Sequence, residues 1–288
     1  MNFEKLLHID RKVIFVLMGV AIVIPLVFPF RLPVGEQPPT RGLFDTIDRI
    51  DPAKQALMVS TDWTPQTEAE NQPMTVALIR HGLARKLRVV VISFYNESIP
   101  MANQAVMQVV EEYNSQAKNE AEKVVYGRDV VLLGWVPPPI VPILGMGQSI
   151  TGVYKVDYYG AGTDTLPIMK GLGSYDDIGL VCAVSGGSSP QWFLQFAQPR
   201  YGVKIAAAVT AVSAPDLYAY IESGQLSGML GGMKGAAEYE NLIEEKYHVG
   251  GRQRAMEGMG PQSIGHLLIM ALVIMGNVGY FVARRKAS

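Results

Sequence analysis

The sequence predicts an α/β fold: a Rossmann-like, mostly parallel sheet of about five strands with helices on both faces, flanked by two transmembrane helices. Three observations support this prediction. Short β-branched runs alternate with longer helical stretches through the middle of the chain, one long uncharged run lies near each end, and apolar residues make up 49% of the 288 residues. Strands separated by helices need crossover connections, which make neighbouring strands parallel.

The first uncharged run, residues 13–30, follows Lys5, Arg11 and Lys12. It is about long enough to cross the hydrocarbon core of a bilayer. A cleaved signal peptide is the alternative, but the run is longer than the apolar region of such a peptide, and no small-x-small cleavage site follows it. We therefore expect an uncleaved transmembrane helix at 13–30, preceded by a cytoplasmic segment at 1–12.

The main domain is expected at 55–263, after a linker and lead-in helix at 31–54 that begins with a Pro- and Gly-rich stretch. Its strands stand out as short β-branched and apolar runs, and its helices as longer stretches with apolar residues three and four positions apart. The expected strands are residues 55–63, 87–95, 128–136, 178–185 and 203–213. The expected helices are residues 68–86, 99–122 and 189–201, followed by a helical stretch at 214–247.

The second uncharged run, residues 264–283, has the length of a membrane span and is followed by the basic tail 284–288. Basic residues lie at the outer end of each expected span. The positive-inside rule then places both termini in the cytoplasm and the main domain on the extracytoplasmic side. We expect the membrane to be a prokaryotic cell membrane.

Small residues at regular spacing suggest close helix packing. Glycines four positions apart in the stretch 224–235 would form a smooth face if the stretch is helical, and the alternative is a Gly-rich turn between two short helices. Small residues also recur in the second span, where the alternative is that they face lipid or the first span. The helix-packing candidates are Gly224, Gly228, Gly232, Gly276, Gly279 and Ala283. They predict that the chain forms a homo-oligomer or contacts other membrane proteins, in addition to its contact with the lipid bilayer.

Ligands of open α/β sheets bind beyond the carboxyl ends of the strands. Several polar or aromatic residues lie at or just beyond the carboxyl ends of the expected strands and are candidates for lining such a crevice. These candidates are Asp62, Asn96, Trp135, Ser213 and Asp216.

The loop "SGGSSP" after the expected fourth strand is a candidate anion-binding loop. Its residues are Ser185, Gly186, Gly187, Ser188 and Ser189. The glycines allow a tight turn with exposed amides, a serine can cap the following helix, and the helix dipole favours an anion there. The alternative is an ordinary helix cap without a ligand. The loop matches neither of the common nucleotide-binding glycine motifs.

Catalytic motifs are weak in this chain, so we predict no catalytic residue, no cofactor and no metal. The loop lacks the Gly-x-Ser-x-Gly pattern of a nucleophile elbow, and a Ser-Lys pair with Lys170 or Lys204 has no motif to support it. His81 lies within an expected helix beside arginines, and we expect it to be solvated. Cys182 is the only cysteine, and its apolar surroundings predict a buried, inert thiol.

Taken together, these features favour a membrane-anchored extracytoplasmic domain that acts as a non-enzymatic scaffold or accessory subunit of an oligomeric membrane assembly. The alternatives are a domain that binds or senses a small anionic ligand and, third, a membrane-anchored serine hydrolase. The net charge of −1 provides no strong field for nucleic acid, so we expect no nucleic-acid partner.

Overall fold

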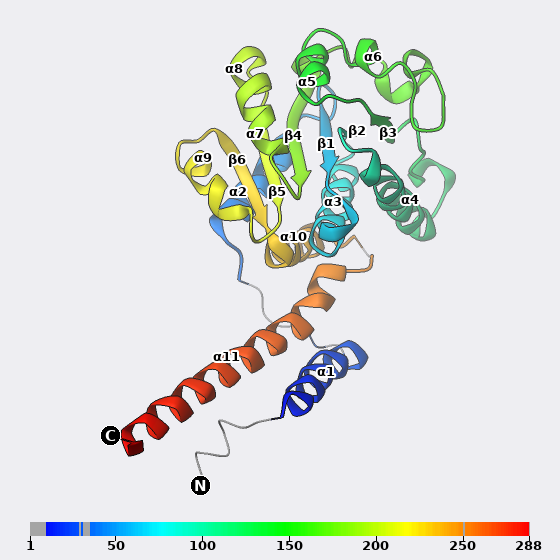
Figure 1. Cartoon of the computed structure of the whole chain (residues 1–288). Helices are drawn as coiled ribbons and strands as arrows, with labels where there is room; N and C mark the ends of the chain where they lie inside the picture. The colour runs from blue at the N-terminus through cyan, green and yellow to red at the C-terminus, as the bar shows by residue number, and fades with distance from the viewer. Residues whose placement is uncertain (1–9, 29, 31–34, 250, 288) are drawn as a thin grey trace. The chain divides into compact units, whose positions relative to one another are not determined.

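The computed structural model contains a six-stranded, all-parallel sheet with helices on both faces (Figure 1). It describes residues 10–28, 30, 35–249 and 251–287. The strands are β1 (Ala56–Asp62), β2 (Val89–Ser93), β3 (Val130–Trp135), β4 (Ile178–Ser185), β5 (Ile205–Val209) and β6 (Leu226–Gly231). Their order in the sheet is β3-β2-β1-β4-β5-β6, so the order reverses between β1 and β4. The predicted α/β class and parallel sheet are confirmed.

The chain divides into two compact units, one formed by residues 34–255 and the other by residues 1–33 and 256–288. The sheet and its helices make up the first unit. Its central strands are buried along their whole length, which explains why their sequences are continuous apolar runs and not alternating patterns. Val59 in β1, for example, lies between Val91 of β2 and Cys182 of β4.

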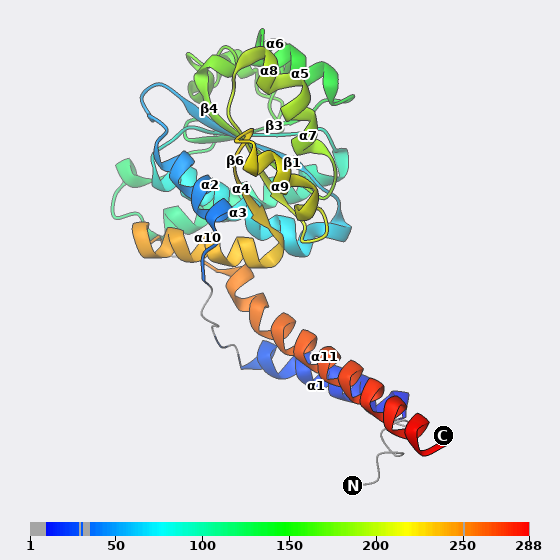
Figure 2. The same ribbon diagram turned by 90° about the vertical axis from the view of Figure 1, so that its left-hand side faces the viewer.

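Two layers of helices cover the sheet, as Figure 2 shows. One layer consists of α2 (Pro38–Asp48), α3 (Glu68–Ala84), α4 (Ile99–Gln116) and α10 (Gly232–Tyr247). The other contains α5 (Ile140–Met146), α6 (Ile150–Val153), α7 (Ser189–Trp192) and α8 (Gln198–Tyr201), with a π-helical turn, Phe193–Ala197, between the last two. The helix α9 (Tyr218–Glu222) precedes β6, and short 3₁₀ turns occupy Pro65–Thr67, Asn96–Ser98, Glu120–Glu122, Thr163–Thr165, Pro167–Met169, Tyr175–Asp177 and Ala214–Leu217.

The sixth strand corrects the prediction that residues 214–247 are helical throughout. Residues 226–231 instead pair with β5, with Leu226 opposite Ile205 and Leu230 opposite Ala208. The glycines therefore do not form one helical face: Gly224 lies in a turn with φ 73°, Gly228 lies inside β6, and Gly232 begins α10 with φ 63°. Pairing with β5 overrides the four-residue spacing because strand formation depends more on neighbours than on local preference.

Gly228 is nevertheless a close-packing residue, and its partner is a helix of the same chain. A Cβ atom at Gly228 would lie only 2.1 Å from the backbone nitrogen of Leu43 in α2. The predicted contact between subunits at this position is therefore wrong, because α2 already occupies the space.

His81 is fully buried, which contradicts the expectation that it is solvated. Its ring stacks on Phe44 of α2 at 4.4 Å between centroids, Nδ1 lies 2.6 Å from the Tyr239 hydroxyl, and Nε2 lies 3.0 Å from Asp48 Oδ1. Lys246 and Tyr247 also donate to the Asp48 carboxylate. Burial lowers the pKa of His81, so the neutral ring fits this position, and it ties α2, α3 and α10 together.

The second unit contains α1 (Arg11–Val27) and most of α11 (Arg254–Ala287). Among the described residues, one helical segment, Arg254–Val282, is long and apolar enough to span a membrane. Only 11% of its most apolar stretch is buried by protein, as expected for a helix whose apolar side chains face lipid and not a protein core. The helix begins ten residues before the span expected at 264–283.

The expectation of a second such span at 13–30 is wrong for the described part of the chain. The helix α1 has 17 residues, or about 26 Å at 1.5 Å per residue, less than the ~30 Å hydrocarbon core. Phe28, which precedes a proline in the sequence, leaves the helical conformation at φ −118° and ψ 75°. A residue before proline disfavours the α region, which explains why the helix ends here.

The small residues of the second run lie on α11. A Cβ atom added at Gly276 would meet nothing within 4 Å, so no described residue covers its surface. Gly279 lies on the same helix, and Ala283 is in it too, although its side chain lies outside the described ones. Helix packing through this surface stays a prediction.

Candidate functional site

Asp62 lies at the carboxyl end of β1, where the strand order reverses, and it is 1% exposed. Its Oδ2 accepts hydrogen bonds from Ser60 Oγ at 2.6 Å and from Ser189 Oγ at the start of α7. Its Oδ1 accepts from the Phe94 backbone N–H at 2.7 Å. Both carboxylate oxygens are thus bonded to groups of the chain itself.

Burial raises the pKa of Asp62 from 3.8 to about 6, although the hydrogen bonds from Ser189, Ser60 and Phe94 act in the opposite direction. Desolvation dominates because the carboxylate loses water on every side. A carboxyl group with this pKa has the basicity of a general base, and Ser189 is the hydroxyl that donates to it. Ser189 is itself fully buried, so in this conformation neither group reaches solvent.

The candidate anion loop folds onto the same cluster. Ser185 Oγ donates to the backbone carbonyl of Asp62 at 3.1 Å and accepts from the Gly187 N–H at 2.9 Å. Gly186 packs closely against Thr67: a Cβ atom at Gly186 would lie 2.8 Å from Thr67 Oγ1. Ser188 precedes α7 without a side-chain capping bond. One of the loop's amides is therefore bonded to protein, and anion binding by the others stays a prediction.

Among the other crevice candidates, Ser213 makes a side-chain contact in the described structure: its Oγ lies 3.1 Å from Thr210 Oγ1, beyond β5. Asn96, Trp135 and Asp216 are exposed. A Ser-Lys pair with Lys204 is excluded by the topology, since Lys204 precedes β5 whereas Ser185 lies opposite Val209 at its far end. Three further hydroxyls were missed at the sequence level: Ser60 donates to Asp62, and Ser93 and Ser98 bond each other and the Thr61 carbonyl. Of these, Ser93 ends β2, and a serine at a strand end is a visible signal.

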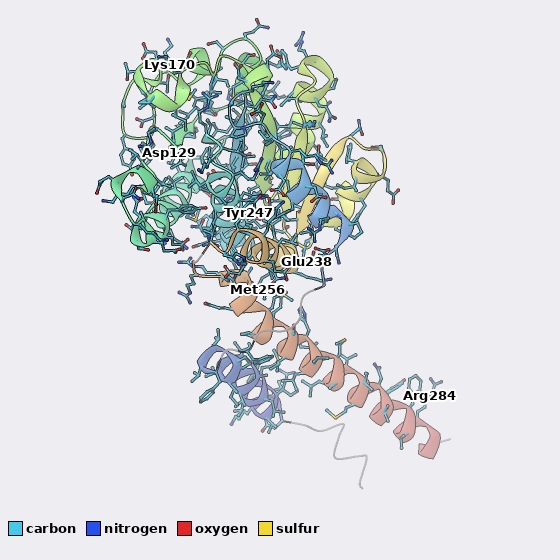
Figure 3. All side chains as sticks on the ribbon, turned by 180° about the vertical axis from the view of Figure 1, so that it is seen from behind. Asp129, Lys170, Glu238, Tyr247, Met256 and Arg284 are labelled. Atoms are coloured by element: carbon cyan, nitrogen blue, oxygen red, sulfur yellow. The ribbon has the colours of Figure 1, made fainter. Side chains whose placement is uncertain are left out.

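A cavity of about 460 Å³ lies at the opposite edge of the sheet, where β2 and β3 begin. Its walls come from the end of α3, the turn before β2, the end of α4, the segment before β3 and the end of α10. Asp129 and Tyr247, labelled in Figure 3, come from two of these walls. We call this cavity the basic pocket, after its four cationic residues Lys86, Arg88, Lys123 and Arg128.

Carboxylates balance the charge of the basic pocket only in part. Arg128 Nη2 lies 2.8 Å from Asp129 Oδ2, which raises the pKa of Arg128, and Lys123 Nζ lies 2.5 Å from Glu120 Oε1. Arg88 donates to backbone carbonyls, at 2.9 Å for that of Lys170. Within the described ranges, the Lys86 ammonium has no partner. Among the described residues, Lys86 and Arg88 therefore lack a carboxylate partner, and their positive charges can attract an anion.

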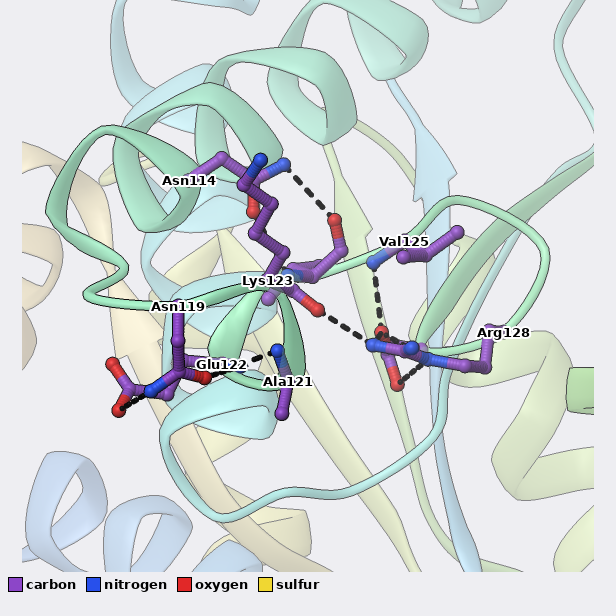
Figure 4. A network of polar contacts seen from close by, with 9 residues as sticks. Asn114, Asn119, Ala121, Glu122, Lys123, Val125 and Arg128 are labelled. Atoms are coloured by element: carbon purple, nitrogen blue, oxygen red, sulfur yellow. Dashed lines mark hydrogen bonds and ion pairs between the residues drawn. The ribbon is translucent and has the colours of Figure 1, made fainter.

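Hydrogen bonds to the backbone hold the rim of the basic pocket in place (Figure 4). Asn114 at the end of α4 bonds both the N–H and the C=O of Val124, at 2.8 and 3.0 Å. Arg128 Nη2 donates to the Lys123 carbonyl at 2.5 Å, and Asp129 accepts from the Val125 N–H at 2.7 Å. The cations therefore sit on an ordered segment.

Apolar groups form the rest of the basic pocket, including Leu83, Leu87 and Val124. Tyr113 and Tyr247 also line it, and their hydroxyls donate elsewhere, to the Arg80 carbonyl at 2.9 Å and to Asp48. Their rings thus add apolar surface. A pocket of this size with cations beside apolar walls suits a small organic anion.

The basic pocket was missed at the sequence level, although a signal was present. Arginines stand at the amino-terminal ends of two expected strands, in "RKLRVVV" and "GRDVVLL". Amino-terminal ends of neighbouring parallel strands share an edge, so these cations meet once β2 and β3 pair. In the described part of the chain, no group of three His, Cys, Asp or Glu side chains has the arrangement of a metal site.

No protein-family model matches this chain, and neither a curated protein nor a solved structure shows significant similarity to it.

Proposed function

We propose that this chain is a membrane-anchored binding protein whose α/β domain takes a small organic anion in the basic pocket. The observation that carries the proposal is the cavity of about 460 Å³ with four cationic and two acidic residues in its walls, including the unpaired Lys86. In this proposal the helix α11 is the membrane anchor, and the basic residues that follow its apolar part support a cytoplasmic C-terminus.

A substitution at Lys86 is the best way to test ligand binding without changing the stability of the fold. Lys86 lies two residues after α3 in the left-handed conformation at φ 56°, where its N–H donates to the Leu83 carbonyl at 2.9 Å. A non-glycine residue there costs about 1 kcal/mol. Replacing Lys86 with glycine therefore removes the ammonium and relieves backbone strain, so binding should weaken without loss of thermal stability.

The test compares naphthalene-2-sulfonate with the neutral naphthalene-2-sulfonamide by isothermal titration calorimetry on the full chain in nanodiscs. We expect only the sulfonate to bind well, with an affinity that falls as salt is added. Lys86→Gln and Lys86→Gly should each weaken it roughly tenfold. Lys204→Gln, which removes an exposed lysine outside the pocket, is the matched control. Equal binding of both probes, or an equal loss in the control, would refute the proposal.

A scaffold or accessory subunit is the second candidate function, favoured by exposed apolar residues at the end of the edge strand β3 and at the start of α5. Trp135 and Ile140 are each 42% exposed and Val141 is 64% exposed, with prolines between them. Exposed apolar patches mark contacts with partners, and tryptophan is the residue type most enriched at their centres.

Native mass spectrometry of the detergent-extracted chain tests this second function by its subunit number. We expect an oligomer that the double change Trp135→Ser and Val141→Ser dissociates by removing the apolar contact. Val212→Ser is the control, because Val212 is 87% exposed but lies after β5. A wild-type monomer in several mild detergents contradicts the scaffold function.

A further inference from the structure

A second cavity, of about 340 Å³, lies at the start of α3 and carries both charge signs. Its walls come from the 3₁₀ turn before α3, the first turns of α3 and the first residue of α11, Arg254. We call it the α3 pocket. None of the residues that line the basic pocket contributes to it, so an inference about it does not depend on the function proposed above.

Gln72, one of the residues that line the α3 pocket, carries a buried acceptor that is unsatisfied among the described residues. The side chain is 2% exposed, and its Nε2 donates to the Met101 carbonyl at 3.3 Å. A carbonyl can only accept, so the amide nitrogen must point to Met101 and the oxygen is the atom left over. Across the described residues, Gln72 Oε1 has no hydrogen-bond donor. A buried acceptor without a donor is costly, and a ligand N–H would remove that cost.

Pro73 supplies a second acceptor in the same wall. It lies inside α3 and has no N–H, so it cannot make the α-helical hydrogen bond to the carbonyl of Ala69, four residues earlier. Ala69 and Pro73 both line the α3 pocket. The Ala69 carbonyl is therefore available to a donor at this position.

Two opposite charges complete the α3 pocket. Glu68 and Arg254 both line it, yet no ion pair joins them, and neither has another charged partner within the described chain. The Arg254 Nε is buried and has no acceptor among the residues that the structure describes. The pocket thus offers acceptors and a carboxylate from α3, and a guanidinium from α11.

We propose that the α3 pocket binds a zwitterion that carries a primary ammonium group and an anionic group. The ammonium donates to Gln72 Oε1, the Ala69 carbonyl and the Glu68 carboxylate, while the anionic group pairs with Arg254. Charge-assisted bonds of this kind are stronger than neutral ones, and each partner that is unsatisfied in the free protein gains one. A free α-amino acid and an ethanolamine phospholipid headgroup share this chemistry.

Calorimetric titration of the full chain in phosphatidylcholine nanodiscs tests the proposal, because these lipids carry no primary ammonium. The probes are L-alanine and glycerophosphoethanolamine, each paired with its trimethylated counterpart, alanine betaine and glycerophosphocholine. Trimethylation keeps the charges but removes every N–H donor. We expect at least one primary ammonium probe to bind, and its trimethylated counterpart to bind about tenfold more weakly or worse.

The two probes identify the source of the ligand: tighter alanine binding indicates a soluble amino acid, and tighter glycerophosphoethanolamine binding indicates a lipid headgroup. Glu68→Gln and Arg254→Gln should each reduce the affinity by about tenfold. Glu222→Gln and Arg200→Gln make the same chemical changes at exposed positions outside the pocket and should have no effect. The proposal fails if no probe binds, if the trimethylated probes bind equally, or if the pocket variants match their controls.

Discussion

Asp62 shows how burial at a strand end changes the chemistry of one carboxyl group. Its pKa is raised to about 6 from 3.8, so between these values the folded state holds a proton that the unfolded state has lost. The stabilising contribution of this proton is complete below about pH 4 and disappears as the pH rises through 6. Above that pH, the fold carries a buried charge that costs up to about 3 kcal/mol.

Asp62→Asn should therefore stabilise the protein at pH 8 and lose this advantage near pH 4. The amide has the same shape, its oxygen can accept from Phe94 N–H, and its nitrogen can donate to the serine hydroxyls. Thermal unfolding of variant and wild type from pH 4 to pH 8 measures the difference, with the exposed Asp216→Asn as the control. A difference in stability that is independent of pH would mean that Asp62 does not titrate in this range.

At the scale of elements, the contact between α2 and β6 depends on the absence of a side chain at Gly228. Its Cα approaches the α2 backbone so closely that a Cβ atom would overlap Leu43 N. Gly187, in the loop after β4, is different: a Cβ atom there would have its nearest neighbour, the Tyr95 hydroxyl, at 3.8 Å.

Gly228→Ala should lower the free energy of unfolding by about 1–3 kcal/mol or more, because α2 must move away from the sheet. Gly187→Ala should change it by less than about 0.5 kcal/mol, because the added methyl group makes ordinary contacts. Chemical denaturation of the two variants gives the comparison. Equal stability of Gly228→Ala and wild type would show that α2 does not pack on β6 as described.

At the scale of the whole molecule, α11 alone has the length and composition of a membrane span in the described chain. Arg284 and the basic residues after it predict that the C-terminus is cytoplasmic and that the α/β domain lies on the other side. Cysteines introduced at Ser115 and Ser288 should therefore react with an impermeant maleimide from opposite sides. The native Cys182 should stay silent, because it is fully buried and burial raises the pKa of its thiol. Labelling of both introduced cysteines from the same side contradicts this topology.

The sequence by itself determined the class of the fold and the positions of five strands. Runs such as "LRVVVISFY" are apolar at every position because both faces of the strand are covered, and that pattern is local enough to be recognised without neighbours. Asp62 and the serine loop were also found from the sequence, because each lies at the carboxyl end of such a run. Whether a strand is buried, and which residue ends it, can both be inferred from residues that are adjacent in the sequence.

The tertiary structure alone decided which distant residues meet. Ser189 and Asp62 are 127 positions apart and become partners only because β1 and β4 pair. Strand β6 forms because β5 offers it a partner, and α2 covers it, so its glycines lie in a strand although their spacing favoured a helix. Likewise, His81 is buried only because Phe44, Asp48 and Tyr239 surround it. Each of these outcomes depends on free energy from contacts between segments far apart in the chain, which no local pattern of residues contains.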